Sequence, residues 1–156
     1  MDAELRRLVR ERAGSRCEYC GMRQEFDELP FQIEHVIPRK HHGSDEEDNL
    51  ALACFACNNH KGPNLSGVDP QTGQMARLFH PRQDKWKEHF EWNGALLVGR
   101  TAIGRATLDV LAINLPYRCA LRAVLVEEGV FPWPGRSAAT WPGAPMYSRK
   151  GRMVKP

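Results

Sequence analysis

Two cysteine pairs limit what this 156-residue chain can fold into more than any other feature of the sequence. Cys17 and Cys20 form one Cys-x-x-Cys pair, Cys54 and Cys57 form the other, and 33 residues lie between the pairs. Thiolates at this spacing reach one tetrahedral ion because the turn between them brings both sulfurs to the same side. We therefore predict a closed site in which four thiolates hold a structural zinc, which small domains often need in order to fold.

Composition places this site in an ordinary globular domain. Hydrophobic residues make up 42% of the chain and charged residues 26%, which are typical proportions for a soluble protein. The chain has no apolar run of membrane-spanning length, and its first residues lack the apolar core of a signal peptide, so we expect a cytoplasmic protein without a membrane partner. Disulfides are rare in that reducing compartment, which favours zinc binding. A thiol-redox or zinc-storage protein is the lesser alternative, since it needs exposed cysteine pairs.

The interval between the cysteine pairs carries a second set of polar side chains. Glu34 and His35 are adjacent in a run that reads as a strand, residues 31–37. A carboxylate binds a hard divalent ion, and a neutral imidazole takes a proton from water near pH 7, so the two together support hydrolysis of a phosphodiester. Asn58 directly follows Cys57 at the start of a predicted helix. Its carbonyl oxygen is available to the same ion, and this oxygen preference suits Mg²⁺ or Mn²⁺.

Further residues of this interval are suited to supporting roles. Asn49 is placed to hydrogen-bond the backbone beside His35 and hold the imidazole. Arg39, Lys40 and Lys61 are placed to neutralise phosphates, and the net charge of +3 is compatible with a polyanionic partner. Taken singly, a histidine is more often a packing or surface residue and an asparagine at a helix start is usually a cap. The combination at these spacings favours a catalytic site.

The same residues resemble the zinc-stapled branch of the HNH endonuclease family over roughly residues 14–64. The resemblance lies in Glu34-His35-Val36-Ile37-Pro38, Asn49-Leu50, Cys54-x-x-Cys57-Asn58 and Lys61-Gly62, preceded by Cys17-x-x-Cys20. It implies a ββα-metal (His-Me finger) core that cuts DNA. It also implies that His35 is the general base, that Glu34 and Asn58 bind the catalytic ion, and that Asn49 orients His35.

The chain departs from the family pattern at two of these positions. Many members have Asp where Glu34 stands, and the last motif residue is often His. Here Asn58, Asn59 and His60 compete for that last role. We favour Asn58 because it directly follows the cysteine, with His60 as the alternative ligand. A zinc-stabilised nucleic-acid-binding protein without catalytic activity is the alternative to a nuclease.

We expect an α+β fold in three parts. Residues 1–66 comprise an N-terminal helix (2–13) and the ββα-metal core stapled by the Cys₄ zinc site. Residues 67–129 form an extension with short strands at 78–82, 89–92 and 96–98 and two C-terminal helices at 102–115 and 116–128, after a turn-rich loop at 62–73. Residues 130–156 are rich in Pro and Gly, and we expect a disordered tail there.

Overall fold

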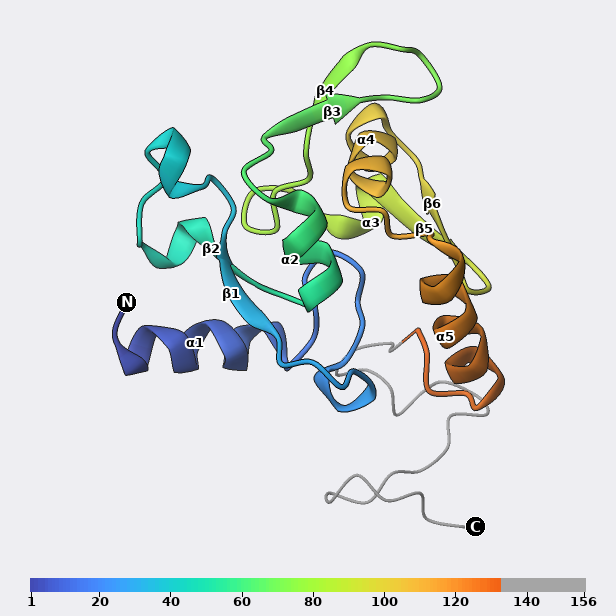
Figure 1. Ribbon diagram of the computed structural model, residues 1–156, viewed down its shortest axis with the longest axis horizontal. Coiled ribbons are helices and arrows are strands. Elements are labelled where there is room, and N and C mark those ends of the chain that lie inside the picture. Colours follow the sequence, from blue (N-terminus) through green and yellow to red (C-terminus); the bar gives the residue numbers. More distant parts are fainter. Residues whose placement is uncertain (133–156) are drawn as a thin grey trace.

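The structure, a computed structural model, describes residues 1–132 and consists of short helices and strands (Figure 1). The helices are α1 (Ala3–Ala13), α2 (Phe55–Lys61), α3 (Trp86–His89), α4 (Ala102–Val110) and α5 (Pro116–Glu127). The strands are β1 (Gln32–His35), β2 (Leu50–Ala53), β3 (Ser66–Val68), β4 (Met75–Arg77), β5 (Phe90–Asn93) and β6 (Leu96–Gly99). Single 3₁₀ turns are η1 (Gln24–Phe26), η2 (Arg39–His41) and η3 (Glu47–Asn49). Within this part of the chain, every helix is too short or too polar to cross a membrane.

The N-terminal part forms a strand–loop–strand–helix unit. β1 and β2 pair antiparallel, with Glu34 opposite Ala51, and α2 follows β2 directly. All four residues of β2 are buried, because α1 packs against this strand pair. α1 begins where the Asp2 side chain accepts a hydrogen bond from Leu5 N and ends at Gly14, whose φ of 62° suits glycine. This unit confirms the expected α+β fold with a ββα core.

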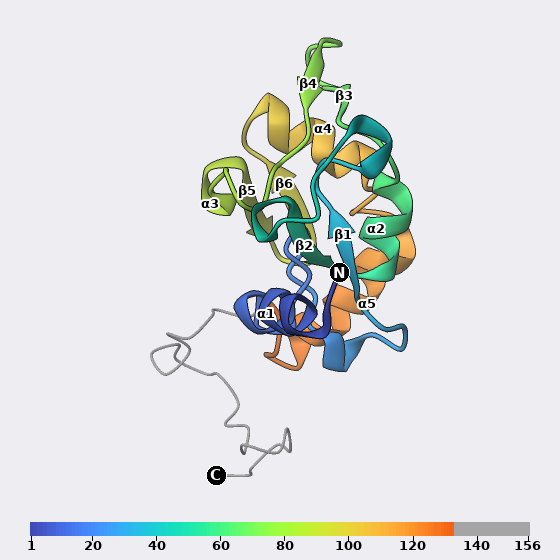
Figure 2. The same cartoon turned by 90° about the vertical axis from the view of Figure 1, so that its left-hand side faces the viewer.

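Two hairpins and two helices make up the extension. β3 pairs with β4 and β5 pairs with β6, each antiparallel, so the described residues form three separate two-stranded sheets. The β3–β4 hairpin projects from the rest of the molecule in both views (Figures 1 and 2), and α4 contacts both hairpins. Gly104 permits this close packing, because a Cβ there would lie 2.1 Å from the carbonyl oxygen of His89.

The extension and the N-terminal unit share one hydrophobic core. Aromatic rings join them: Tyr19 meets Phe79 edge-on with 6.3 Å between ring centroids, and Phe79 meets Phe90 at 5.3 Å. Val130 and Phe131, at the start of the expected tail, are buried in the same core. The expectation of disorder for the remainder of that segment falls on residues 133–156, which lie outside the described part of the chain.

Two local predictions in the extension were wrong. Residues 78–82 form no strand, because the Asp84 carboxylate accepts a hydrogen bond from His80 N and closes a turn. The segment 62–73 contains the short strand β3 within the predicted loop, and α3 occupies residues just before β5. The helices predicted at 102–115 and 116–128 are present as α4 and α5, with α4 ending earlier, at Val110.

Candidate metal centre and active site

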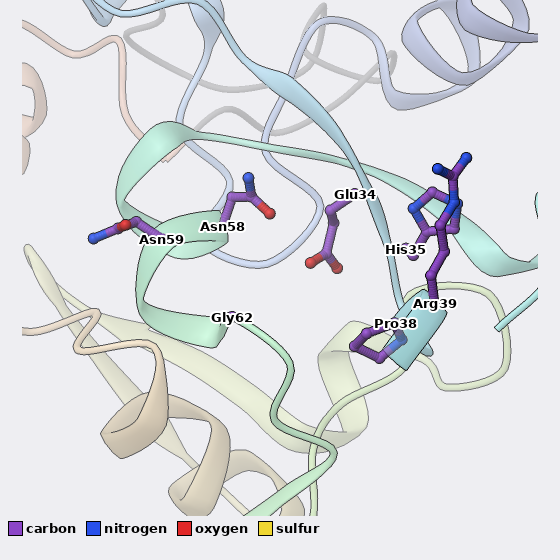
Figure 3. Close-up of a pocket in the computed structure, with 7 residues that line it drawn as sticks. All are labelled: Glu34, His35, Pro38, Arg39, Asn58, Asn59 and Gly62. Atoms are coloured by element: carbon purple, nitrogen blue, oxygen red, sulfur yellow. The ribbon is translucent and has the colours of Figure 1, made fainter. Parts of the chain in front are cut away.

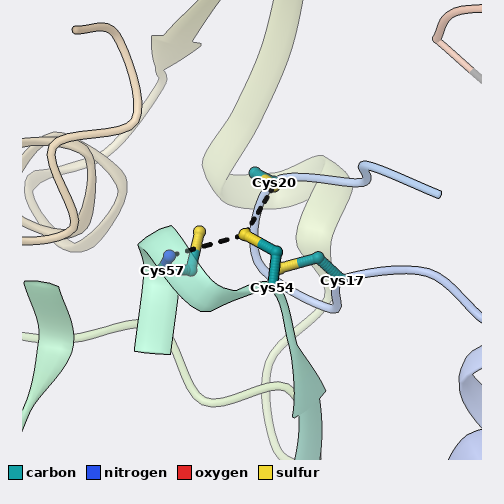
Figure 4. Close-up of side chains that lie close together, drawn as sticks. All are labelled: Cys17, Cys20, Cys54 and Cys57. Carbon is teal, nitrogen blue, oxygen red and sulfur yellow. Dashed lines mark hydrogen bonds between the residues drawn. The ribbon is translucent and has the colours of Figure 1, made fainter. Parts of the chain in front are cut away.

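The four paired cysteines meet in one buried cluster (Figure 4). Their sulfur atoms all lie within 4.8 Å of one another, and Sγ of Cys20 is 3.8 Å from Sγ of Cys54. A tetrahedron with zinc–sulfur bonds of about 2.3 Å has edges of about 3.8 Å. The cluster therefore has the ligand type and about the size that a tetrahedral zinc ion needs, and its burial does not suit the redox alternative, which needs exposed pairs.

Local turns bring each pair of sulfurs together. In the first pair, Gly21 N donates to Cys17 O at 2.9 Å, and Gly21 has a φ of 75°, which favours glycine. In the second pair, Cys54 caps α2, and its sulfur accepts a hydrogen bond from Cys57 N at 3.4 Å. Burial raises the pKa of the Cys17 and Cys57 thiols. An ion must therefore displace protons to bind, as zinc does at thiolate sites.

Arg118 from α5 reaches this cluster, which sequence reasoning missed. Its Nη2 lies 3.0 Å from Sγ of Cys57 and 3.9 Å from Sγ of Cys54, while Nη1 donates to the carbonyl oxygen of Leu111 at 2.8 Å. Arg118 is itself buried. A buried guanidinium facing thiolates compensates the negative charge of a Cys₄ zinc site. No local sequence signal marks it, because 60 residues lie between Cys57 and Arg118.

A second site lies beside the cluster, in an open pocket of about 450 Å³ between β1 and α2 (Figure 3). The residues that line it come from the end of β1, the turn η2 and the helix α2. They are Glu34, His35, Pro38, Arg39, Asn58, Asn59 and Gly62. The pocket therefore brings together the predicted acid, the predicted base and the predicted amide, although 22 residues separate His35 from Asn58.

Glu34 lies at the buried base of this pocket. Its carboxylate accepts a hydrogen bond from the Tyr19 hydroxyl, and its Oε2 lies 3.4 Å from Nζ of Lys61. Burial raises the pKa of Glu34, while the Lys61 charge and the Tyr19 hydrogen bond oppose the shift. These two donors stabilise a carboxylate that burial alone would neutralise.

Lys61 does not occupy the position that we predicted for it. Its side chain is 1% exposed, and Nζ also donates to the carbonyl oxygens of Val36 at 3.0 Å and His35 at 3.4 Å. A lysine enclosed in this way cannot contact a phosphate. It supports Glu34 and the end of β1 instead, because the strand end leaves carbonyl groups that need a donor.

The amide of Asn58 is oriented toward Glu34. Its Nδ2 donates to Oε1 of Gln32 at 2.6 Å, and its oxygen faces Glu34 in Figure 3. Asn59 points away from Glu34 in the same view, and His60 is exposed and does not line the pocket. Of the three competing residues, Asn58 is the one whose oxygen is available to an ion beside Glu34.

His35 lies on the rim and points to the opposite side of β1 from Glu34 (Figure 3), as expected for neighbours on a strand. Its Nε2 lies 2.6 Å from Oδ1 of Asp45, which also accepts hydrogen bonds from Arg39. These hydrogen bonds from His35 and Arg39 lower the pKa of Asp45. Sequence reasoning missed Asp45 because it stands in an acidic run, Asp45-Glu46-Glu47-Asp48, in which no member is distinguished.

Asn49 holds the loop between β1 and β2. Its Oδ1 accepts from Ile37 N at 2.8 Å, and its Nδ2 donates to the carbonyl oxygens of Ile37 and Ser44, each at 2.9 Å. The buried amide thus contacts the backbone two residues after His35 rather than the histidine itself. Gly43 fits beside it because any Cβ there would collide with the Ile37 carbonyl at 1.6 Å.

Of the remaining predicted basic residues, Arg39 and Lys40 are exposed in η2 at the pocket rim. Arg39 lines the pocket while its guanidinium donates to Asp45. Both are therefore accessible to a polyanion, in contrast to Lys61.

Comparison with known proteins finds similarity over part of the chain. Residues 17–64 match the family model described as HNH endonuclease. The chain is also similar to the Septu protein PtuB of Bacillus thuringiensis, with 26% identity over 106 residues. That alignment covers 67% of this chain and 38% of the relative, so the chain spans well under half of that protein. No solved structure matches the chain. Residues 17–64 are thus similar to HNH endonucleases, and the Cys₄ cluster in the same segment fits the zinc-stapled form of that family.

Proposed function

We propose that the chain is a metal-dependent endonuclease that hydrolyses DNA phosphodiester bonds at the pocket between β1 and α2. One observation carries the proposal. Within a segment that matches the HNH endonuclease family, a carboxylate and an amide oxygen face one another, and a histidine stands on the rim of the same pocket. A structural zinc module needs none of these groups.

The donor set of the pocket suits a hard divalent ion. Glu34 offers a carboxylate and Asn58 an amide oxygen, and Mg²⁺ and Mn²⁺ bind through few protein oxygens while keeping waters and substrate phosphate as further ligands. Such an ion would stabilise charge that develops on the phosphate and the leaving oxygen. The cysteine cluster offers only sulfur ligands, which suit zinc, and the pocket offers oxygen ligands, which suit Mg²⁺ or Mn²⁺. The two kinds of ion would therefore not compete for one site.

His35 is suited to the role of general base. If its Nε2–H donates to Asp45, the lone pair lies on Nδ1, which makes no hydrogen bond within residues 1–132. Nδ1 then takes a proton from water, and the Asp45 carboxylate stabilises the imidazolium that results. Asn49 maintains the loop behind this histidine.

Arg39 and Lys40 are the groups suited to contact the DNA backbone. They follow His35 by four and five residues and are exposed beside the pocket. Such contacts position the duplex without reading its sequence. The alternative, a zinc-stabilised nucleic-acid-binding protein without activity, requires the same basic residues but not His35.

Nicking of supercoiled plasmid tests the proposal. The wild type is incubated with Mg²⁺, Mn²⁺ or EDTA and compared with His35→Ala, with circular dichroism on each sample. We expect metal-dependent nicking that falls about 10²- to 10⁴-fold in His35→Ala. His42→Asn is the matched control, because it removes an exposed imidazole from the same loop and asparagine tolerates its φ of 62°.

Equal nicking by the wild type and His35→Ala would contradict the assignment of the base. Absence of nicking in every metal, with DNA binding retained, would favour the binding protein over the nuclease.

A further inference from the structure

Tyr19, which lies between the two cysteines of the first pair, points its side chain toward the pocket rather than the cysteine cluster. Tyr19 stands between Cys17 and Cys20, yet its hydroxyl donates to Oε1 of Glu34 on β1. Its side chain is 0% exposed. A buried hydroxyl satisfied by a carboxylate makes a strong, charge-assisted hydrogen bond. The zinc cluster and the pocket are therefore joined through one residue.

The position of Tyr19 is set from several sides. The flanking cysteines fix its backbone when they bind an ion, its carbonyl oxygen accepts a hydrogen bond from Nε1 of Trp86 at 2.8 Å, and its ring packs edge-on against Phe79. The neighbouring Glu18 accepts from Leu52 N at 2.8 Å, which ties the same turn to β2. The hydroxyl thus has little freedom to follow a displaced carboxylate.

The two oxygens of Glu34 have different partners. Oε1 accepts from Tyr19, and Oε2 lies 3.4 Å from Nζ of Lys61. These contacts determine the rotation of the carboxylate about its last bond and thereby the direction of the lone pairs that remain. Hydrogen-bond partners of a metal ligand commonly control its orientation, and losing one costs about 10- to 100-fold in metal affinity.

We propose that Tyr19 is a positioning residue for the divalent ion, holding the Glu34 carboxylate in its ligating orientation from the turn that binds zinc. This inference rests on the proposed function, since it requires Glu34 to be a ligand of that ion. Tyr19 itself contacts neither the ion nor the substrate. Through Tyr19, the geometry of the ion site at Glu34 depends on the turn between Cys17 and Cys20.

Titration of the zinc-loaded protein with Mn²⁺, followed by electron paramagnetic resonance of the free ion, tests the proposal. The variants are Tyr19→Phe, which removes only the hydroxyl, Glu34→Gln, which removes the ligand charge, and Tyr117→Phe, the matched control at an exposed tyrosine of α5. Zinc content and thermal melting are measured on every sample. We expect Tyr19→Phe to bind Mn²⁺ about 10- to 100-fold more weakly, with one zinc per chain retained and Tyr117→Phe unchanged.

The outcomes separate this inference from the function on which it rests. Loss of Mn²⁺ binding in Glu34→Gln with unchanged affinity in Tyr19→Phe would overturn the positioning role alone. Equal Mn²⁺ affinity in Glu34→Gln and the wild type would overturn both the ligand assignment and the inference. Loss of zinc from Tyr19→Phe together with Mn²⁺ affinity would show a structural role and overturn the inference as well.

Discussion

The cysteine cluster and the pocket lie side by side on α2 but are built in different ways. The cluster uses four copies of one ligand, closed on all sides and paired by local turns. The pocket uses a carboxylate, an amide and an imidazole in an open site, and each is held by a different partner: Tyr19 and Lys61, Gln32, and Asp45 respectively. A structural site can thus be specified by short spacings, whereas a catalytic site needs supporting residues drawn from elsewhere in the fold.

The two sites also share parts of their framework. Cys57 and Asn58 are consecutive on α2, so one helix presents a cysteine of the cluster and the amide of the pocket. Tyr19 makes the second connection. Disturbing the cluster should therefore damage both sites, whereas disturbing the pocket should spare the cluster.

Removal of zinc should have the largest effect. Cys54→Ser deletes a ligand and the cap of α2, and structural zinc contributes about 10–16 kcal/mol of apparent binding free energy, comparable with the whole stability of a domain. We expect Cys54→Ser to lose cooperative thermal unfolding by circular dichroism and to hold no stoichiometric zinc. Cys119→Ser, outside the cluster, is the control. A cooperative transition in Cys54→Ser near the wild-type midpoint would show that the cluster is dispensable for folding.

Replacement of Lys61 should have an intermediate effect confined to the pocket. Lys61→Met leaves the buried Glu34 carboxylate without its cation, which should lower the free energy of unfolding by about 3–5 kcal/mol in urea. The double variant with Glu34→Gln should lose less, because no uncompensated charge remains. Zinc content should be unchanged in both. Exposed Lys40→Met is the control, expected within about 0.5 kcal/mol of wild type. An equally small loss in Lys61→Met would mean that Glu34 is neutral in the fold.

Replacement of Arg118 should have the smallest effect and test whether the extension supports the cluster. Arg118→Met removes the guanidinium that faces Cys54 and Cys57, so we expect zinc affinity to fall about 10- to 100-fold in competition with a chromogenic chelator. Arg118→Lys should keep part of the affinity, because it retains the charge but not the two-sided donor geometry. Exposed Arg100→Met serves as the comparison. Unchanged zinc affinity in Arg118→Met would show that the cluster does not need the guanidinium from α5 to bind zinc.

Sequence reasoning succeeded where the relevant contacts are short in the chain. The spacing of the cysteines predicted the cluster, and the residue pattern at 31–37 predicted β1. The helix expected to start near Cys57 is α2, which begins two residues earlier, at Phe55. It failed for Lys61, because a lysine near a motif is expected to be exposed, and the sequence does not show that this one is buried. It also failed at 78–82, where the Asp84 side chain accepts a hydrogen bond from the backbone of His80, four residues earlier, and a turn forms instead of a strand.

By itself, the sequence determined the identity and the order of the chemical groups: four thiolates in two pairs, an acid beside a histidine, and an amide directly after the second cysteine pair. Spacings of two or three residues constrain geometry directly, because a turn or one helical step has few conformations. Only the tertiary structure decided which groups support the site. Tyr19, Asp45 and Arg118 meet their partners across 15, 10 and 61 residues respectively. Contacts over such separations depend on how the elements pack, which no local pattern encodes.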